Sequence, residues 1–305
     1  MNEFMTGFYN VATSKGRNPD ALLVDSMLSA SPVLKHVEWT PANRETQHIF
    51  REVADVQGIE IIDFDAPLPA VKASFSLAQA NLTPLGGLLQ IGDDLARQVG
   101  GHEQYFKEQG LLFAKEAGCK LEASYFDRIL KTAIEKGKAF EASDSDKPLP
   151  AVVVATWQPS ETCALYSSIN SKIGERFFDM QKLSSGDVYL TADNVAVRGC
   201  FIKCCIGLLL ANKRSYSALV NIPENITPAA FAAEMAKVID MASPTDKTTV
   251  IMPRSLKTRI ASMYSQYGTS NSLMRFNDNY ELTICGVKVI GSPNIPLNYT
   301  LPSPT

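Results

Sequence analysis

Histidine is scarce in this chain, and paired cysteines are absent. Of 305 residues, three are histidine, and none of the six cysteines stands in a Cys-x-x-Cys pair. A zinc site is therefore not expected. Cys200, Cys204 and Cys205 lie in an apolar, strand-like run, where cysteine usually serves as a small hydrophobic residue. Cysteines used in this way indicate a reducing compartment.

The common catalytic motifs are also missing from the sequence. It contains no Gly-x-Ser-x-Gly elbow, phosphate-binding loop, His-Glu-x-x-His pair or dinucleotide-binding glycine pattern. Gly86-Gly87 and Gly100-Gly101 are more typical of turns or helix boundaries, and Asp93-Asp94 of a helix start than of a metal site. We therefore predict no catalytic, cofactor-binding or metal-binding residues, and a protein that is not an enzyme. One alternative stays open, a cysteine-dependent hydrolase in which Cys163 and His102 meet in space.

No charge of either sign dominates, and long hydrophobic runs are lacking. The 29 basic and 32 acidic residues give a formal net charge of −3, which argues against tight binding of a phosphate backbone. The longest apolar run, 204–211, is too short for a membrane span. The first ten residues lack the layout of a secretory signal. We therefore expect no membrane partner.

The clearest positive signal is a long helix, predicted over residues 103–136. Apolar residues recur along it at the helical period with charges between them, and Gly137 follows at the usual stop position. Gly110 and Gly118 weaken such a helix, so another element must pack against it. Glu122 is expected on the charged face. The predicted apolar stripe consists of Tyr105, Phe106, Leu112, Phe113, Cys119, Phe126, Ile129, Leu130, Ala133 and Ile134.

The residues before this helix form few elements of their own. Residues 1–33 contain one short helical pattern, Ala21–Leu28, and are expected to lie as an arm on other surfaces. A charged two-stranded ribbon is predicted from Gln47–Val56 and Ile59–Phe64, which would turn near Gln57-Gly58. Because an isolated ribbon is marginally stable in water, it requires a partner surface, and another subunit would supply one.

Beyond a polar segment at 141–148, strands and helices alternate and predict an α+β fold. Residues 151–157 read as a strand buried on both faces. Thr227-Pro228 has the signature of a capped helix start. Two short strands are predicted around Gly286.

Three stretches of this second half, together with the order of elements, resemble a known family. They are residues 198–222 (RGCFIKCCIGLLLANKRSYSALVNI), 250–257 (VIMPRSLK) and 285–296 (CGVKVIGSPNIP). The chain resembles the major capsid proteins of tailed bacteriophages, which share the fold named after phage Hong Kong 97. The ribbon, Trp157-Gln158 and Leu219 depart from the pattern of the most similar branch.

The resemblance implies a division of the chain into five parts. These are an N-terminal arm (1–35), an extended loop (36–75), a peripheral domain with the spine helix (76–147), an axial domain (148–280), and return strands with a tail (281–305). It implies a subunit that assembles in the host cytoplasm into hexamers and pentamers of an icosahedral virion shell. Scaffold, portal and decoration proteins would be partners, with packaged double-stranded DNA held by proximity only. An encapsulin-like nanocompartment shell is the alternative within the same fold.

Overall fold

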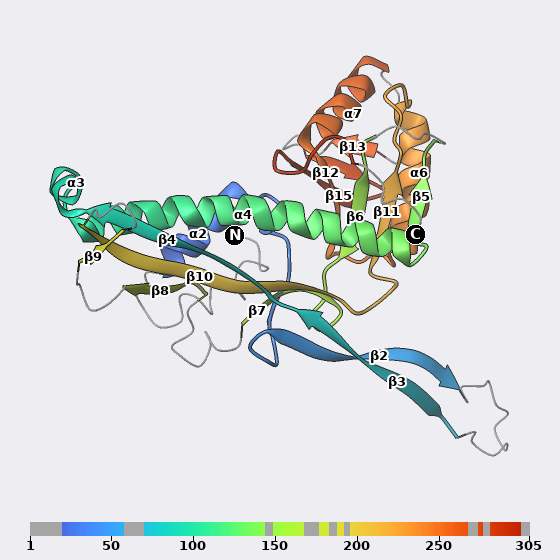
Figure 1. Ribbon diagram of the computed structural model, residues 1–305. Coiled ribbons are helices and arrows are strands. Elements are labelled where there is room, and N and C mark those ends of the chain that lie inside the picture. Colours follow the sequence, from blue (N-terminus) through green and yellow to red (C-terminus); the bar gives the residue numbers. More distant parts are fainter. Residues whose placement is uncertain are drawn as a thin grey trace.

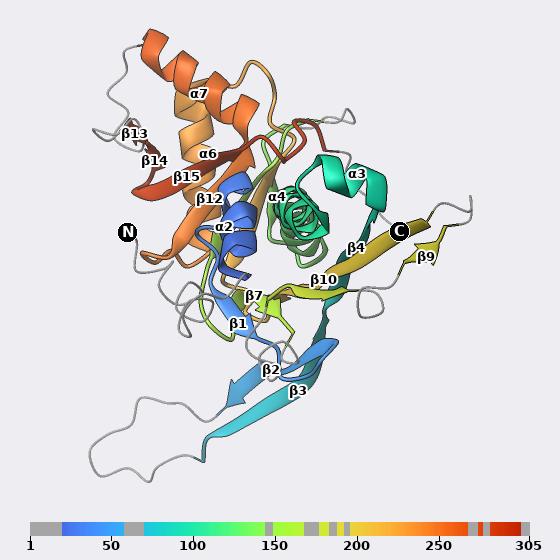
Figure 2. The same ribbon diagram turned by 90° about the vertical axis from the view of Figure 1, so that its left-hand side faces the viewer.

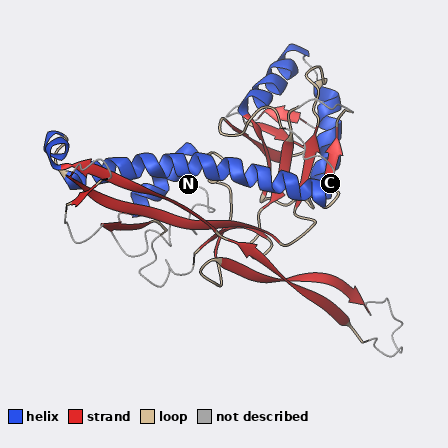
Figure 3. Ribbon diagram, viewed as in Figure 1, coloured by secondary structure: helices blue, strands red, loops and turns tan. Residues whose placement is uncertain are grey.

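The structure, a computed structural model, describes residues 20–57, 70–143, 149–167, 177–182, 188–191, 196–267, 274–276 and 281–299. One long helix, α4 (His102–Glu135), runs along the molecule with a sheet beneath it (Figure 1). A separate group of strands and helices stands over the C-terminal end of α4, and a hairpin projects from the far side. Helices and strands are mixed throughout, which confirms the predicted α+β class (Figure 3).

Helix α4 confirms the predicted long helix with its bounds shifted by one residue. Its N-cap is Gly101, and Gly137 follows its last turn with a φ of 64°. A positive φ is costly for any residue with a Cβ, so glycine ends the helix as predicted. A short helix before it, α3 (Asp93–Gln98), was also predicted, and it carries two acidic residues in its first turn.

The sheet beneath α4, here called the first sheet, has the strand order β1-β7-β10-β4 among the described residues, with β8 and β9 also paired to β10. Alternate residues of β4 are partly buried, and Leu85 and Leu89 among them pack against the core that includes α4. The hydroxyl of Tyr125 on α4 donates to the carbonyl oxygen of Gly207 on β10 at 2.9 Å. The strands are β1 (Trp39–Pro41), β4 (Thr83–Gly92), β7 (Thr162–Tyr166), β8 (Asp179–Lys182), β9 (Tyr189–Leu190) and β10 (Ala196–Leu210).

The second sheet forms a lobe with two helices, α6 (Pro228–Met241) and α7 (Arg254–Tyr267), and its described strands have the order β13-β14-β15-β12-β6-β11-β5. Its central strands are buried along their whole length because α6 and α7 cover one face and the end of α4 covers the other (Figure 2). The strands are β5 (Ala139–Glu141), β6 (Val152–Thr156), β11 (Tyr216–Val220), β12 (Thr248–Pro253), β13 (Met274–Phe276), β14 (Leu282–Ile284) and β15 (Val287–Ser292).

The start of α6 follows the predicted capping signature. The backbone N–H of Ala230 donates to the side-chain oxygen of Thr227 at 3.3 Å, and Pro228 occupies the first turn. This cap satisfies a helix N–H that has no partner within the helix.

The hairpin exists, but the prediction of its second strand was wrong. The strand that pairs antiparallel with β2 (Gln47–Gln57) is β3 (Lys72–Asn81), whereas the predicted partner was 59–64 after a turn near Gln57-Gly58. Residues 58–69 themselves lie outside the described part of the chain. The error arose because residues 72–81 carry no β-branched side chain, and their strand is specified by pairing rather than by local propensity. The predicted boundary at 75 therefore falls inside β3.

The prediction that residues up to about 33 lie as a surface arm was wrong for helix α2 (Asp20–Ala30). Leu23, Val24 and Met27 of this helix are buried in the main core beside α4. A Cβ added to Gly118 of α4 would lie 2.4 Å from the carbonyl oxygen of Met27. The glycine that weakens α4 therefore allows the two helices to touch.

Two residues of α4 lie on the opposite side from the one predicted. Leu112, assigned to the apolar stripe, is 55% exposed, and Glu122, assigned to the charged face, is completely buried. Phe126 and Leu130 are buried as predicted. The face of α4 that packs against α2 consists partly of small residues such as Gly118. The buried stripe follows this face and does not include Leu112. The buried residues are Phe106, Gly110, Ala114, Ala117, Gly118, Glu122, Tyr125, Phe126, Ile129, Leu130 and Ala133.

The predicted domain boundaries do not follow the sheets. Residues 148–280 were assigned to one domain, but β7 to β10 belong to the first sheet, and β6, β11 and β12 belong to the lobe. β15 was expected to return toward the peripheral domain, yet it pairs parallel with β12 inside the lobe. Ile295, which follows it, does reach the core around α4. The predicted boundaries fail because strands that are consecutive in the sequence belong to different sheets.

Candidate functional site

The β2–β3 hairpin is the most prominent surface feature, since it extends away from the rest of the molecule (Figures 1 and 2). Leu77 on β3 is 77% exposed, and Val71, the residue before the start of β3, is 62% exposed. Among the described residues these two strands form a sheet by themselves, so each has one unpaired edge. Exposed apolar side chains and open strand edges are features of a surface that binds another chain.

The root of the hairpin is fixed firmly to the first sheet. The side-chain amide of Asn43 donates to the carbonyl oxygen of Ile49 at 2.6 Å, and its oxygen accepts from the N–H of Ile49 at 2.9 Å. Ala80 and Leu82 are buried in a small cluster with residues of β7 and β10. The base of the hairpin is therefore fixed in place, and its two strands extend from that base into solvent.

A second candidate surface lies where α4 begins. Leu95 of α3 and Leu190 of β9 are exposed here, at 53% and 65%. The Oδ1 atom of Asp93 lies 3.1 Å from Nε of Arg198 and 2.8 Å from Nε2 of His102. The histidine contact is an ion-pair distance without hydrogen-bond alignment. This arrangement fixes α3, α4 and β10 to one another.

An exposed apolar pair lies on the face of the first sheet that points away from α4. Phe201 of β10 is paired in register with Leu88 of β4, and each is more than two-fifths exposed. The alternation of β10 could have revealed Phe201, because Cys200 and Ile202 on either side of it are buried. Because the whole run was predicted to be apolar and strand-like, Phe201 was not expected at the surface.

The structure does not bring Cys163 and His102 together. Cys163 pairs with Leu209 at the end of β10, whereas His102 contacts Asp93, which pairs with Arg198 at the start of that strand. Burial raises the pKa of the Cys163 thiol, although hydrogen bonds from Thr40 and Ser160 oppose the shift. A thiol held protonated is a poor nucleophile.

The part of the chain that the structure describes has neither a metal-binding cluster nor a membrane-spanning helix. No group of three or more histidine, cysteine or acidic side chains there could hold a metal ion. None of its helices is long and apolar enough to cross a membrane. The expectation of no catalytic, cofactor-binding or metal-binding residue stays a prediction for the whole chain.

Comparison with solved structures identifies the architecture. A chain of bacteriophage Epsilon15 aligns over 86% of this chain and 86% of its own, with a TM-score of 0.55 and 12% identity. A chain of the bacteriophage JBD30 capsid aligns over 84% of this chain and 88% of its own, with a TM-score of 0.51 and 7% identity. The chain has a bacteriophage capsid fold. No protein-family model and no curated protein sequence matches it.

The capsid fold confirms the resemblance drawn from the sequence at the level of architecture. Because the shared identity is so low, the likeness is carried by the arrangement of elements rather than by conserved side chains. The candidate site in this capsid fold is accordingly a set of surfaces: the hairpin, the α3 end and the outer sheet face.

Proposed function

We propose that this chain is the major capsid protein of a tailed double-stranded DNA bacteriophage, which assembles with its own copies into an icosahedral shell. The fold shared with the Epsilon15 and JBD30 chains supports this proposal. One observation carries it: the β2–β3 hairpin is packed at its root against the first sheet but is uncovered by the rest of the described chain. A two-stranded ribbon is marginally stable in water, so a neighbouring copy is expected to cover it.

The parts of the molecule take the following roles in this proposal. The hairpin is the extended loop, α4 with the first sheet is the peripheral domain, and the lobe is the axial domain. Copies meet as hexamers and pentamers in a virion shell that assembles in the host cytoplasm. Scaffold, portal and decoration proteins are further partners. The net charge of −3 suits a shell that encloses DNA without gripping it. The subunit acts structurally, without a catalytic site or cofactor.

The decisive experiment shortens the hairpin. Replacing residues 53–75 by a four-residue Gly-Ser turn joins Glu52 to Ser76, which are opposite each other in the β2–β3 register. The buried root at Ala80 and Leu82 stays intact. We expect unchanged circular dichroism and a similar urea midpoint, but no closed particles by negative-stain microscopy. Loss of the fold would show that the hairpin belongs to the core.

A matched pair of single substitutions refines this test. Leu77→Ser and Leu112→Ser each remove an exposed leucine, one on the hairpin and one on α4. Leu77→Ser should raise the subunit concentration needed for assembly at least several-fold, and Leu112→Ser should affect assembly less. The opposite order would argue against the hairpin as the assembly contact.

The contents of native particles decide between the two kinds of shell. Double-stranded DNA in particles from the natural source supports the virion, whereas a protein cargo without nucleic acid would indicate a nanocompartment. A hydrolase would instead lose activity on Cys163→Ala without any effect on particle formation. A chain that stays monomeric at high concentration, across salt and crowding conditions, would exclude both shells.

A further inference from the structure

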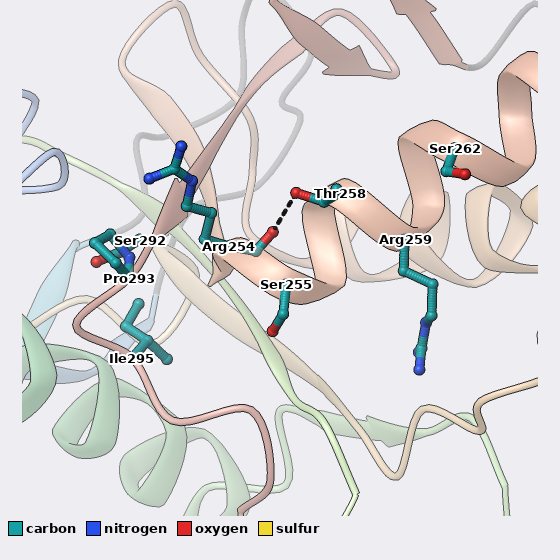
Figure 4. Close-up of a pocket in the computed structure, with 8 residues that line it drawn as sticks. All are labelled: Arg254, Ser255, Thr258, Arg259, Ser262, Ser292, Pro293 and Ile295. Carbon is teal, nitrogen blue, oxygen red and sulfur yellow. Dashed lines mark hydrogen bonds between the residues drawn. The ribbon is translucent and has the colours of Figure 1, made fainter.

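Helix α7 borders an open hollow in the lobe, of about 700 Å³. It is lined by Arg254, Ser255, Thr258, Arg259 and Ser262 of α7 and by Ser292, Pro293 and Ile295 (Figure 4). Two lining residues carry a guanidinium group, three carry a hydroxyl on the helix, and no acidic side chain lines the hollow among the described residues. The cavity therefore has an uncompensated positive charge.

Arg259 is the unusual member of this cavity. Its Nε and Nη2 atoms are buried, and within the described part of the chain they have no hydrogen-bond acceptor. Buried donors of this kind normally find a partner, because an unmet donor loses its water without any compensating bond. A ligand that accepts hydrogen bonds from Arg259 would explain why these donors have no acceptor in the free subunit.

The surroundings of Arg259 favour an anion. Ser255 and Ser262 stand four residues before and three residues after it, so all three lie along one side of α7. The helix begins at Arg254, and the N–H groups of its first turn add partial positive charge at this end of the cavity. The hydroxyl of Thr258 is already engaged, because it donates to the carbonyl oxygen of Arg254 at 3.0 Å.

We infer that this cavity binds a phosphate-class oxyanion, with Arg259 as the principal ligand. The side chain of Arg259 turns about its own bonds so that its planar fork donates two hydrogen bonds to the anion. Ser255 and Arg254 supply further donors at the rim. A tetrahedral anion suits this set better than a carboxylate, since it offers more acceptor oxygens. The anion is either free phosphate or a phosphodiester of nucleic acid, and the inference does not depend on shell assembly.

The test uses the full chain and two glutamine variants. Arg259→Gln removes the proposed ligand, and Arg97→Gln removes an exposed guanidinium on α3, far from the cavity, as the control. Binding of inorganic phosphate is measured by calorimetry and thermal melting in a buffer free of phosphate and sulfate. Binding of a short DNA duplex is measured by fluorescence anisotropy at low salt. We expect Arg259→Gln to weaken binding at least tenfold and Arg97→Gln to change it less than twofold.

The melting temperature without any anion separates a ligand from a structural arginine. Because Arg259 has unmet donors in the free subunit, Arg259→Gln should melt no lower than the wild type in phosphate-free buffer. Phosphate binding that depends on Arg259 identifies a free anion site, and binding of the duplex alone identifies nucleic acid as the source. The inference is overturned if neither probe binds, if Arg259→Gln binds as tightly as the wild type, or if that variant is destabilised without anion.

Discussion

The side-chain amide of Asn294 donates a hydrogen bond of 2.6 Å to Oε2 of Glu122, 172 residues earlier in the chain. The other carboxylate oxygen of Glu122 accepts from the N–H of Val33 at 3.1 Å. Asn294 also donates to the carbonyl oxygen of Ala30 at 3.0 Å. One buried carboxylate in the middle of α4 thus holds both the segment after α2 and the segment after β15.

Glu122→Ala is therefore expected to destabilise the subunit strongly. It leaves the Val33 N–H and one donor of Asn294 buried without acceptors, at a cost of about 3 kcal/mol in the free energy of unfolding. Urea unfolding of the hairpin-shortened variant measures this without interference from assembly. Glu116→Ala, an exposed carboxylate on the same helix, is the control and should change stability by less than about 0.5 kcal/mol. Equal stability of the two variants would contradict the stabilising role of the hydrogen bonds to Glu122.

Phe126 and Leu112 test which face of α4 supports the core. Phe126 is buried in the main cluster, so Phe126→Ala should leave a cavity and cost about 3–5 kcal/mol. Leu112 is mostly exposed, so Leu112→Ala should cost under about 0.5 kcal/mol. Both are measured by urea unfolding in the hairpin-shortened background. A Phe126→Ala variant that unfolds like its parent would mean that the stripe is a seam between subunits.

Gly118→Ala should destabilise although alanine is the better helix former. The gain of about 1 kcal/mol in helix propensity is outweighed, because the new Cβ would lie 2.4 Å from a backbone oxygen of α2. Since backbone cannot rotate away, the two helices must separate, and we expect a net loss of about 1–3 kcal/mol. Lys120→Ala on the same helix, at an exposed position, serves as the control. A variant more stable than the wild type would show that α2 moves freely over α4.

His36 predicts a dependence of stability on pH. Its pKa is lowered from 6.5 to about 4, mainly by burial and further by the charges of Lys288 and Lys35, with Glu281 opposing the shift. The unfolded chain therefore takes up a proton as the pH falls below 6.5, while the folded chain does so only near 4. Stability from this group is complete above 6.5 and is lost as the pH falls from 6.5 to 4.

The magnitude is on the order of 1–2 kcal/mol, because the half-buried ring is partly screened by water. Urea unfolding of the wild type and His36→Gln at several pH values measures it as a difference. Their stability difference should change across this window and stay constant above it. A difference that is the same at every pH would refute the assignment to His36.

The sequence was sufficient where a signal was local. The period of α4, the cap at Thr227 and the turn at Gly286 each depend on residues close together in the chain, and each element was predicted with nearly its observed bounds. The buried strand at 152–156 was also predicted, because a continuous apolar run has few alternatives.

Long-range pairing could not be predicted from the sequence alone. β3 forms because it pairs with β2, which is not its immediate neighbour in the sequence. Glu122 is buried because donors from Val33 and Asn294 form hydrogen bonds with its carboxylate. A charged residue on a helix normally predicts a solvent-exposed face. Of the candidate surfaces, the hairpin was predicted in part, but the outer sheet face was missed, since exposure at Phe201 and Leu88 depends on which sheet face α4 covers.

The chain passes repeatedly between the first sheet and the lobe. β6 of the lobe is followed by β7 beneath α4, β10 is followed by β11 of the lobe, and the chain leaves β15 to place Ile295 beside α4. A protease cut in the polar segment 141–148 would therefore give two fragments on a denaturing gel that still elute together from a sizing column. For the same reason, no continuous stretch of the gene encodes either unit on its own.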